Sequence, residues 1–354
     1  MADRRFRAGQ SPPLRFAPMA NPGPLLQHPA IQGDLVRVED ALRASVVADD
    51  PFLTEVASHL ITAGGKRGRP LFAVAAAATG ASELGPVHDD VIHGGVSVEL
   101  VHLGSLYHDD VMDDATTRRT VESVNARWGN LQAILAGDYL LARASEIAAS
   151  LGTEVAGLLA RTIGRLCEGQ IRELQTTYDA NRTIESYLAS IEGKTASLFA
   201  TAARIGAITS GLPREHVEAL TDFGLAFGMA FQIVDDVLDV TATDEQLGKP
   251  AGHDLIEGVY TLPVLLTMAD GGADGDALRA GLGRPLSLDE MHAARAIVRS
   301  SGQLEPSLAE AERWVERGVD ALSVLGPSEA ADAMAGQARH LLVDVRGIAA
   351  GTVS

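Results

Sequence analysis

Helix-forming sequence with helical apolar spacing runs through most of this chain, and no other feature limits its fold as much. Leu35, Val38, Leu42 and Val46 form one apolar stripe. A longer stripe contains Leu151, Val155, Leu158, Leu159, Thr162, Ile163 and Leu166. Ala and Leu favour helices, aromatic residues make up only 4%, and no run of alternating β-branched residues indicates a strand. We therefore predict an all-α fold, a single large helical bundle.

Breaks in this pattern divide the chain into helices of roughly 12 to 25 residues. They lie at Gly64–Gly65, Thr79–Gly80, Gly129, Gly211–Pro213, Gly248–Gly252 and Gly271–Pro285. Residues 1–30 differ from the rest, because arginines and prolines dominate them and helical spacing is absent. We expect a flexible arm over 1–30 and one domain over 31–354.

Composition narrows the choice of partner and compartment. The chain has 47 acidic against 29 basic residues, a net charge of −18, whereas nucleic-acid binding needs clustered Lys and Arg. Cys167 is the sole cysteine, so no intrachain disulfide can form, and its apolar neighbours predict a buried thiol. No apolar run approaches the roughly 18 residues of a membrane span, and no secretory signal is visible. We expect a cytoplasmic protein with no nucleic acid and no stable membrane anchor.

Two short acidic segments carry the strongest chemical signal. Both read D-D-x-x-D, over Asp109–Asp113 and Asp235–Asp239, and both end a long apolar stretch of expected helix. In each segment the first and last aspartates lie one above the other on a helix face. Stacked carboxylates repel unless a cation joins them, and Mg²⁺ takes carboxylate oxygens together with water and substrate phosphates. The two segments therefore predict a magnesium site, with a solvated acidic face as the alternative.

Cationic residues stand near both acidic segments. The candidates are Lys66, Arg67 and Arg69 in a glycine-rich turn, Arg118 and Arg119 after the first segment, Lys194 with Thr195, and Lys249 after the second. Arginine and lysine are the usual side chains for binding phosphate, although any one of these could be an ordinary surface cation. Together they indicate a site for two anions, one held through metal ions and one by direct contacts.

Other catalytic patterns are missing from the sequence. It has no P-loop, no G-x-S-x-G motif, no H-E-x-x-H and no cysteine pair. His102 precedes Asp109 by two helical turns and is expected to face the same pocket.

These motifs resemble the trans-isoprenyl diphosphate synthases, also called polyprenyl synthetases, over nearly the whole chain from residue 33. Gly65–Pro70 resembles the family's G-K-x-x-R-P, and the acidic segments resemble its two aspartate-rich motifs. Further matches are Arg118-Arg119, Gly137-Asp138-Tyr139-Leu140, Lys194-Thr195, Phe231-Gln232, Gly248-Lys249-Pro250 and Thr261-Leu262-Pro263. The resemblance is strongest to long-chain bacterial members. It implies a helical bundle around a central substrate cavity, a catalytic domain over 31–354 and a homodimer.

The resemblance also implies a role for each matching residue. Lys66, Arg69, His102 and Arg119 would hold isopentenyl diphosphate, with Arg67 beside them. Asp109, Asp113 and Asp235 would bind Mg²⁺, three ions per site, supported by Asp110, Asp236 and Asp239. Arg118, Lys194, Thr195, Gln232 and Lys249 would contact the allylic diphosphate of a farnesyl or geranylgeranyl primer. The six aspartates, Lys194 and Lys249 are the implied catalytic set.

The sequence departs from the family pattern in two places. After Arg119 the family often has Gly-Pro, where this chain has Thr120-Val121-Glu122-Ser123, so the loop is expected to differ. The family also often has E-G-K before T-L-P, whereas Glu257-Gly258-Val259 lacks the lysine. One cation for the diphosphate is therefore missing, which bears on affinity rather than on reaction type.

The implied reaction transfers an alkyl group other than methyl. Metal ions help pyrophosphate to leave, the double bond of isopentenyl diphosphate attacks the allylic cation, and proton loss gives a longer chain. The growing tail is expected to pass Val101, Gly104 and Ser105, where no aromatic side chain blocks it. We predict a product of about thirty to fifty carbons, as in menaquinone side chains, although close helix packing also favours small residues.

Three alternatives remain open. A short-chain enzyme, such as a farnesyl or geranylgeranyl diphosphate synthase, would keep the same motifs. A class I terpene cyclase usually replaces the second aspartate motif and does not need G-K-x-x-R-P, so Asp235–Asp239, Lys66 and Arg69 argue against it. A non-catalytic subunit of a heteromeric synthase typically has degraded aspartate motifs, and here both are whole.

Overall fold

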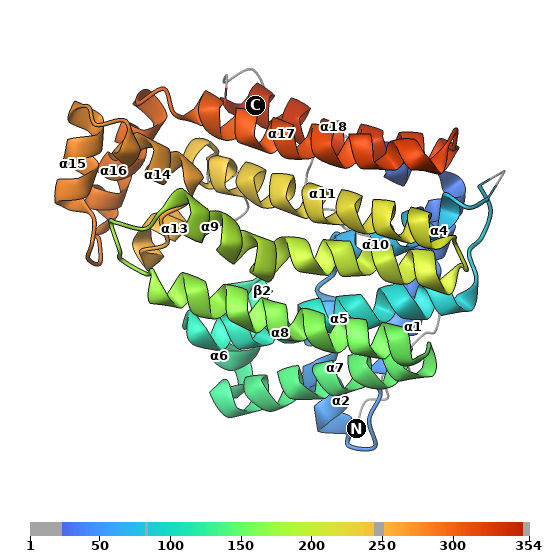
Figure 1. Cartoon of the computed structure of the whole chain (residues 1–354). Coiled ribbons are helices and arrows are strands. Elements are labelled where there is room, and N and C mark those ends of the chain that lie inside the picture. Colours follow the sequence, from blue (N-terminus) through green and yellow to red (C-terminus); the bar gives the residue numbers. More distant parts are fainter. Residues whose placement is uncertain (1–22, 82–83, 244–250, 350–354) are drawn as a thin grey trace.

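The computed structural model describes residues 23–81, 84–243 and 251–349, and this part of the chain is almost entirely helical (Figure 1). The first half contains η1 (Pro24–Gln27), α1 (Pro29–Ser45), α2 (Pro51–Ala57), α3 (His59–Thr62), α4 (Gly68–Ala78), α5 (Asp89–Met112), β1 (Thr117–Arg118), β2 (Val121–Glu122), α6 (Val124–Trp128), α7 (Asn130–Ser150) and α8 (Thr153–Gln175). The second half contains α9 (Ile184–Ile191), the π-helical turn η2 (Glu192–Ala196), α10 (Ser197–Thr209), α11 (Arg214–Thr241), α13 (His253–Glu257), α14 (Leu262–Ala269), α15 (Ala273–Gly281), α16 (Leu288–Ser300), α17 (Leu304–Ala321), η3 (Leu322–Leu325) and α18 (Glu329–Ala349). The prediction of an all-α bundle is confirmed.

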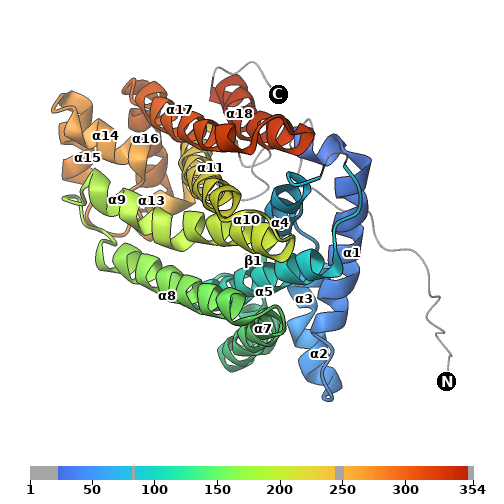
Figure 2. The same cartoon turned by 45° about the vertical axis from the view of Figure 1, so that its right-hand side comes forward.

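The core lies where α4, α5, α10 and α11 pack together (Figure 2). α7 covers α5 on one side, and α17 and α18 cover α11 on the other. Ring contacts with centroids 4.3 to 6.4 Å apart join Phe72, Phe199, Phe223, Phe227 and Phe231. Because these rings come from α4, α10 and α11, they fix α11 against α4 and α10 over the three turns before the second acidic segment.

Several helices begin or end where the sequence predicts breaks, whereas others, such as α5 and α8, end at positions where no break was predicted. α4 ends at Ala78, before the break at Thr79–Gly80, and α11 starts directly after Gly211–Pro213. The stretch 271–285 is an exception, because α15 lies inside the predicted break. Its Leu278 is fully buried, and α14 and α16 pack against the helix. This short helix was not predicted, because the glycines on either side of it indicated a break.

Residues 24–30 fall within the predicted arm, yet they form η1 and the start of α1. Leu25 in η1 is fully buried, and η1 packs against α18. Pro24 and Pro29 stand at the first positions of η1 and α1, where the fixed φ of proline suits a helix start. Residues 1–22 of the predicted arm lie outside the described residues.

The thiol of Cys167 is exposed, so the prediction of a buried cysteine is wrong. The stripe of α8 that faces the core includes Val155, Leu159 and Thr162, which are buried as predicted. Cys167 is offset from this stripe by more than a quarter of a turn, at 100° per residue, and lies on the outer side.

α11 is long and apolar enough to cross a membrane, and no other helix in the described ranges passes this test. However, 67% of its most apolar window is buried inside the fold. A helix that is surrounded by other helices is apolar on all sides for this reason alone.

Candidate active site

The first acidic segment forms the C-terminal end of α5, and Asp113 is the residue after its last turn. Burial raises the pKa of Asp109. Burial, followed by the charges of Glu257 and Asp109, raises the pKa of Asp113 to about 6. These two carboxylates therefore lose hydration and repel one another, which favours a cation between them.

Asp110 in the same segment turns into the protein and is fully buried. Its Oδ1 accepts a hydrogen bond from Arg118 Nε at 2.7 Å and lies 2.6 Å from Arg118 Nη2 in an ion pair. The resemblance assigns Arg118 to the allylic diphosphate, whereas in this structure Arg118 ties the hairpin β1–β2 to the end of α5. That hairpin was not predicted. Its turn residues Arg119 and Thr120 have φ of +53° and +65°, in a turn that usually favours Asn and Gly.

The second acidic segment lies in the last turns of α11. Asp236 is buried, and both of its oxygens are occupied. Oδ2 accepts from the Tyr187 hydroxyl at 2.6 Å, and Oδ1 accepts from Gln232 Nε2 at 2.8 Å. Burial raises the pKa of Asp236 to about 7 even though both hydrogen bonds oppose this. Asp235 is exposed and Asp239 is buried, so the three aspartates have different surroundings.

Lys194 and Thr195 stand on η2, and π-helical turns are often found at functional sites. Lys194 Nζ lies 2.6 Å from Glu173 Oε1, and Thr195 Oγ1 donates to Gln232 Oε1 at 2.8 Å. Burial alone would lower the pKa of Lys194, but the charges of Glu173, Asp109 and Asp113 outweigh it and raise the pKa. The charges of the first acidic segment therefore stabilise the protonated form of Lys194.

A cavity of about 100 Å³ connects these residues. Lys194, Thr195, Gln232 and Asp236 line it together with Glu173, Arg182, Tyr187, Ile191, Asp254, Glu257, Val259 and Thr261. Glu257, which lines this cavity, also raises the pKa of Asp113 through its charge, so the first acidic segment lies within electrostatic range of the cavity. Sequence reasoning missed Glu173, Arg182 and Tyr187, because nothing in their local sequence distinguishes them. Lys249 lies outside the described residues.

The carboxylates fit Mg²⁺ by their chemistry. Asp109 and Asp113 present hard oxygen ligands one helical turn apart, with the pKa shifts of crowded, partly dehydrated carboxylates. Among the residues that the structure describes, no three His, Cys, Asp or Glu side chains are arranged to hold an ion by themselves. Mg²⁺ usually takes one or two protein carboxylates and completes its shell with water and substrate phosphates. Asp109, Asp113 and Asp235 are the residues that would hold it.

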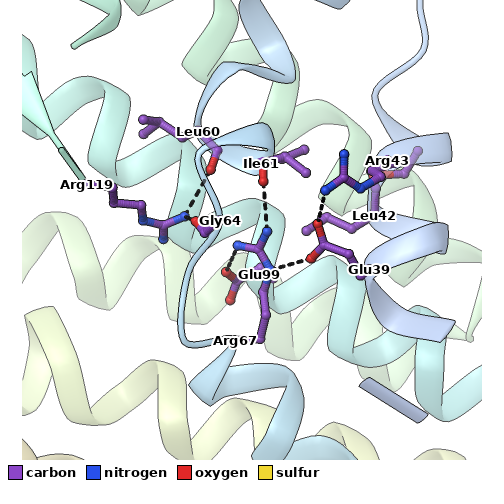
Figure 3. A network of polar contacts seen from close by, with 10 residues as sticks. Glu39, Leu42, Arg43, Leu60, Ile61, Gly64, Arg67, Glu99 and Arg119 are labelled. Atoms are coloured by element: carbon purple, nitrogen blue, oxygen red, sulfur yellow. Dashed lines mark hydrogen bonds and ion pairs between the residues drawn. The ribbon is translucent and has the colours of Figure 1, made fainter. Parts of the chain in front are cut away.

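Arg67, predicted with the substrate cations, has a structural role (Figure 3). It is 2% exposed and its φ is +49°. Its Nε donates to Glu39 at 2.8 Å, its Nη1 to Glu99 at 3.1 Å and its Nη2 to the Ile61 carbonyl at 3.1 Å. Every guanidinium nitrogen thus has an internal partner. These contacts give the buried side chain a structural role in the turn before α4, and a role beside the substrate cations stays a prediction.

Arg119 reaches the same turn from the hairpin. Its Nη1 donates to the carbonyls of Leu60, at 3.1 Å, and Gly64 (Figure 3). A Cβ at position 65 would lie 2.7 Å from Arg119 Nη1, so only glycine allows the guanidinium to pass so close. Burial lowers the pKa of Arg119.

Arg69 and His102 form a half-buried pair between α4 and α5. Arg69 Nη1 lies 3.1 Å from His102 Nε2, and the Arg69 guanidinium lies 4.7 Å from the centre of the Phe199 ring. Burial, and then the charge of Arg69, lowers the pKa of His102 well below its usual value, so the imidazole is neutral and accepts this hydrogen bond. Burial also lowers the pKa of Arg69, to about 10. Lys66, three residues before Arg69, is exposed at the same turn.

The predicted chain-length residues have different surroundings. Val101 and Gly104 are buried, and Ser105 is half-buried with its hydroxyl bonded to the His102 carbonyl at 2.9 Å. A Cβ on Gly104 would lie 3.1 Å from the Gly137 carbonyl oxygen and 3.2 Å from Leu141 Cγ. Close packing of α5 on α7 therefore explains the glycine at position 104. This supports the alternative that helix packing, rather than product length, requires a small residue here. Ser105 is then the better candidate for a residue that limits product length.

Sequence comparison finds related proteins of one kind. The family model described as polyprenyl synthetase matches residues 50–297. A nonaprenyl diphosphate synthase of Mycobacterium tuberculosis is 42% identical over 286 residues, covering 80% of this chain and 83% of that protein. A heptaprenyl diphosphate synthase component 2 of Geobacillus stearothermophilus is 40% identical over 301 residues, covering 85% of this chain and 92% of that protein.

Solved structures with the same fold include enzymes of different names. A polyprenyl synthase from Caulobacter crescentus, complexed with calcium and isoprenyl diphosphate, has a TM-score of 0.83 at 34% identity and covers 90% of this chain and 96% of its own. A geranylgeranyl pyrophosphate synthase from Corynebacterium glutamicum, also complexed with calcium and isoprenyl diphosphate, has a TM-score of 0.78 at 39% identity. The match covers 89% of this chain and 96% of that one.

Proposed function

This chain belongs to the polyprenyl synthetase family, and we propose that it lengthens an allylic diphosphate with isopentenyl diphosphate to a long all-trans polyprenyl diphosphate. It is a prenyltransferase, an enzyme that transfers an alkyl group other than methyl. One observation carries the proposal: Lys194 lines the cavity that contains Asp236 and lies close enough to Asp109 and Asp113 for their charges to raise its pKa. Two acidic segments with a lysine between them suit a metal-bound diphosphate.

The residues around this cavity would bind and ionise the allylic substrate. When bound, Mg²⁺ neutralises negative charge on the diphosphate and makes pyrophosphate a better leaving group. Asp109, Asp113 and Asp235 would hold the metal, for which we propose three ions per site. Lys194 and Thr195 would contact the diphosphate itself. Gln232 and Tyr187 hold Asp236 in place by hydrogen bonds to both of its oxygens, so we propose that Asp236 supports the site without binding metal itself.

The Arg69–His102 pair would hold isopentenyl diphosphate, together with Lys66 and Arg119. The neutral imidazole accepts from Arg69 and so orients the guanidinium without adding charge. Both groups stand on the side of α5 and α4, two turns before Asp109, so the second substrate is held near the first. The apolar core around α10 and α11 excludes water from the allylic cation. The proton lost in the last step would pass to the departing pyrophosphate.

The relatives' names support a long product. Nonaprenyl and heptaprenyl denote nine and seven isoprene units, which lie inside the predicted range of about thirty to fifty carbons. We propose a farnesyl or geranylgeranyl primer and a product used for menaquinone side chains. A short product is the second candidate, because a geranylgeranyl pyrophosphate synthase is among the structural neighbours.

We also propose a homodimer in the cytoplasm. Large apolar side chains are exposed on α7 and α8, including Leu131, Leu135, Ile171 and Leu174. Exposed apolar groups on neighbouring helices suit burial against a second copy of the chain. One relative is named as component 2 of its synthase, so a different partner subunit is the alternative occupant of this face. The lone cysteine supports a reducing compartment.

Replacing Asp235 tests the metal assignment. Asp235→Ala should abolish incorporation of isopentenyl diphosphate, with a loss of at least about 1000-fold, because one carboxylate ligand is gone. Asp222→Ala is the matched control, since Asp222 is an exposed aspartate on the same helix, outside the site. The control should leave turnover unchanged, and both variants should keep their helical circular dichroism. Full activity of Asp235→Ala would refute the assignment.

A further inference from the structure

Arg182 is a buried arginine that lines the pocket, and no sequence motif indicated it. It precedes Thr183, the residue that caps α9, and it is 6% exposed. Its Nη1 donates to the carbonyl oxygen of Tyr260 at 3.0 Å, and its guanidinium lies 5.6 Å from the centre of the Tyr187 ring. The side chain lines the same cavity as Lys194 and Asp236.

One edge of this guanidinium has no internal partner. Nε and Nη2 are both buried, and neither has a hydrogen-bond acceptor among the described residues. In arginine these two groups lie side by side on one edge of the plane and form a fork for two oxygen atoms of one anion. Leaving a buried charged donor without a partner is costly, so a partner is expected when the site is filled.

The neighbouring carboxylates do not satisfy this edge. Asp236 is bonded to Tyr187 and Gln232, and Glu173 is bonded to Lys194. Both act on Arg182 only through their charge, as Asp254 also does, and burial is the larger effect and lowers its pKa. Because Arg182 lines the cavity, an anion that enters the cavity is the partner that we expect for Nε and Nη2.

The fork is held rigidly beside Val259. Tyr178, in the same loop as Arg182, donates its backbone N–H to the Gly258 carbonyl at 2.8 Å and its hydroxyl to the Ile256 carbonyl at 3.1 Å. The Tyr260 hydroxyl in turn accepts from the backbone N–H of Gly283 at 2.6 Å. The α8–α9 loop is thus docked onto residues 256–260, and Arg182 reaches the residue next to Val259. Pre-ordered donors bind an anion without a further ordering cost.

We infer that Arg182 is a diphosphate-binding residue, which donates two hydrogen bonds to the allylic diphosphate and to the pyrophosphate product, at the place where Val259 offers no cation. The inference rests on the proposed function, because it names a further contact of the same substrate. Arg182 and Lys194 then both supply positive charge to one cavity. The missing lysine at position 259 is replaced in space by an arginine from a distant part of the chain.

Pyrophosphate binding tests this without turnover. The full-length protein is titrated with inorganic pyrophosphate in the presence of Mg²⁺, by calorimetry. Arg182→Met should weaken binding about 10- to 100-fold, since two charge-assisted hydrogen bonds are lost. Arg204→Met is the matched control, because Arg204 pairs with Glu218 at the surface of α10. It should bind pyrophosphate as the unaltered protein does. Equal affinity of Arg182→Met and the control would overturn the inference.

A lysine at position 259 distinguishes a binding role from a structural one. In the Arg182→Met background, Val259→Lys should restore affinity by at least about 10-fold, because a cation returns to the same cavity. In the unaltered protein the same change should gain less than about 3-fold, since Arg182 already occupies the position. The comparison of Val259→Lys with the unaltered protein does not depend on the folding of Arg182→Met, because both proteins contain Arg182. A 10-fold gain in the unaltered protein, or no gain in the Arg182→Met background, would contradict the inference.

The outcomes also separate this inference from the proposed function. The unaltered protein must bind pyrophosphate with Mg²⁺ and incorporate isopentenyl diphosphate, and failure of both would refute the proposed function itself. Normal binding and turnover that do not change in Arg182→Met would refute only the role of Arg182. In active variants, the loss should appear as a higher KM for the allylic substrate, with KM for isopentenyl diphosphate unchanged.

Discussion

Arg67 and Arg69 are two residues apart in the sequence, yet the fold uses them for different purposes. Arg67 donates hydrogen bonds to Glu39, Glu99 and the Ile61 carbonyl (Figure 3). Arg69 keeps a buried Nε without a hydrogen-bond partner among the described residues, and faces His102. Burial and partners, rather than residue type, therefore decide which cation supports the fold and which one remains for a substrate.

Removing Arg67 should destabilise the protein strongly. Arg67→Met leaves Glu99 buried without its cation and leaves Glu39 with Arg43 alone, and breaking a buried ion pair in this way typically costs about 3–5 kcal/mol. Arg43→Met is the matched control, because Arg43 also pairs with Glu39 but lies partly exposed, where such pairs contribute about 1 kcal/mol or less. Urea unfolding of both variants gives the comparison. Similar, small losses for both would mean that Arg67 does not stabilise the turn.

Sequence reasoning finds residues whose role shows in local spacing. The positions of the D-D-x-x-D segments at helix ends and the buried stripe at Leu35 and Val38 agree with the structure, because helical spacing is a local property, while the metal-binding role of the segments stays a prediction. The roles of Arg67 and Arg182 depend on partners on other elements. Glu99 is 32 residues from Arg67, and Tyr260 is 78 residues from Arg182. No spacing rule connects residues so far apart.

At the level of elements, α5 joins the two halves of the site. Its last turn carries Asp109, while His102 lies two turns earlier against Arg69 on α4. Gly104 between them faces α7, and η2 brings Lys194 toward the end of α5 from the other side. One rigid helix therefore sets the spacing between the proposed sites for the two diphosphates.

A bulky side chain on α5 should shorten the product. Ser105→Phe places a ring one turn before Asp109, where the growing tail is expected to pass, and the product ladder should end about two or more isoprene units earlier. Gly104→Ala is the control: its Cβ would press on α7, so we expect a stability loss of about 1–3 kcal/mol with an unchanged ladder. A folded Ser105→Phe enzyme with the original ladder would show that the tail takes another path.

At the scale of the whole molecule, the fold is a thick helical bundle whose site lies at one end of α5 and α11 (Figure 1). α11 is apolar along most of its length because α10, α17 and α18 surround it. Such a core provides the dry surroundings that an allylic cation needs, and it has few polar groups that could react with one. The site chemistry then comes from the helix ends, where Asp109, Asp235 and Lys194 gather.

The size of the product tests this account most directly. The purified full-length chain is incubated with Mg²⁺, labelled isopentenyl diphosphate and farnesyl or geranylgeranyl diphosphate, and the dephosphorylated products are separated by length. We predict a ladder that ends above about thirty carbons. Products of fifteen or twenty carbons would keep the reaction and contradict the long-chain assignment. No incorporation from either primer, by protein that is folded and binds Mg²⁺, would contradict the proposed enzyme and favour a partner subunit.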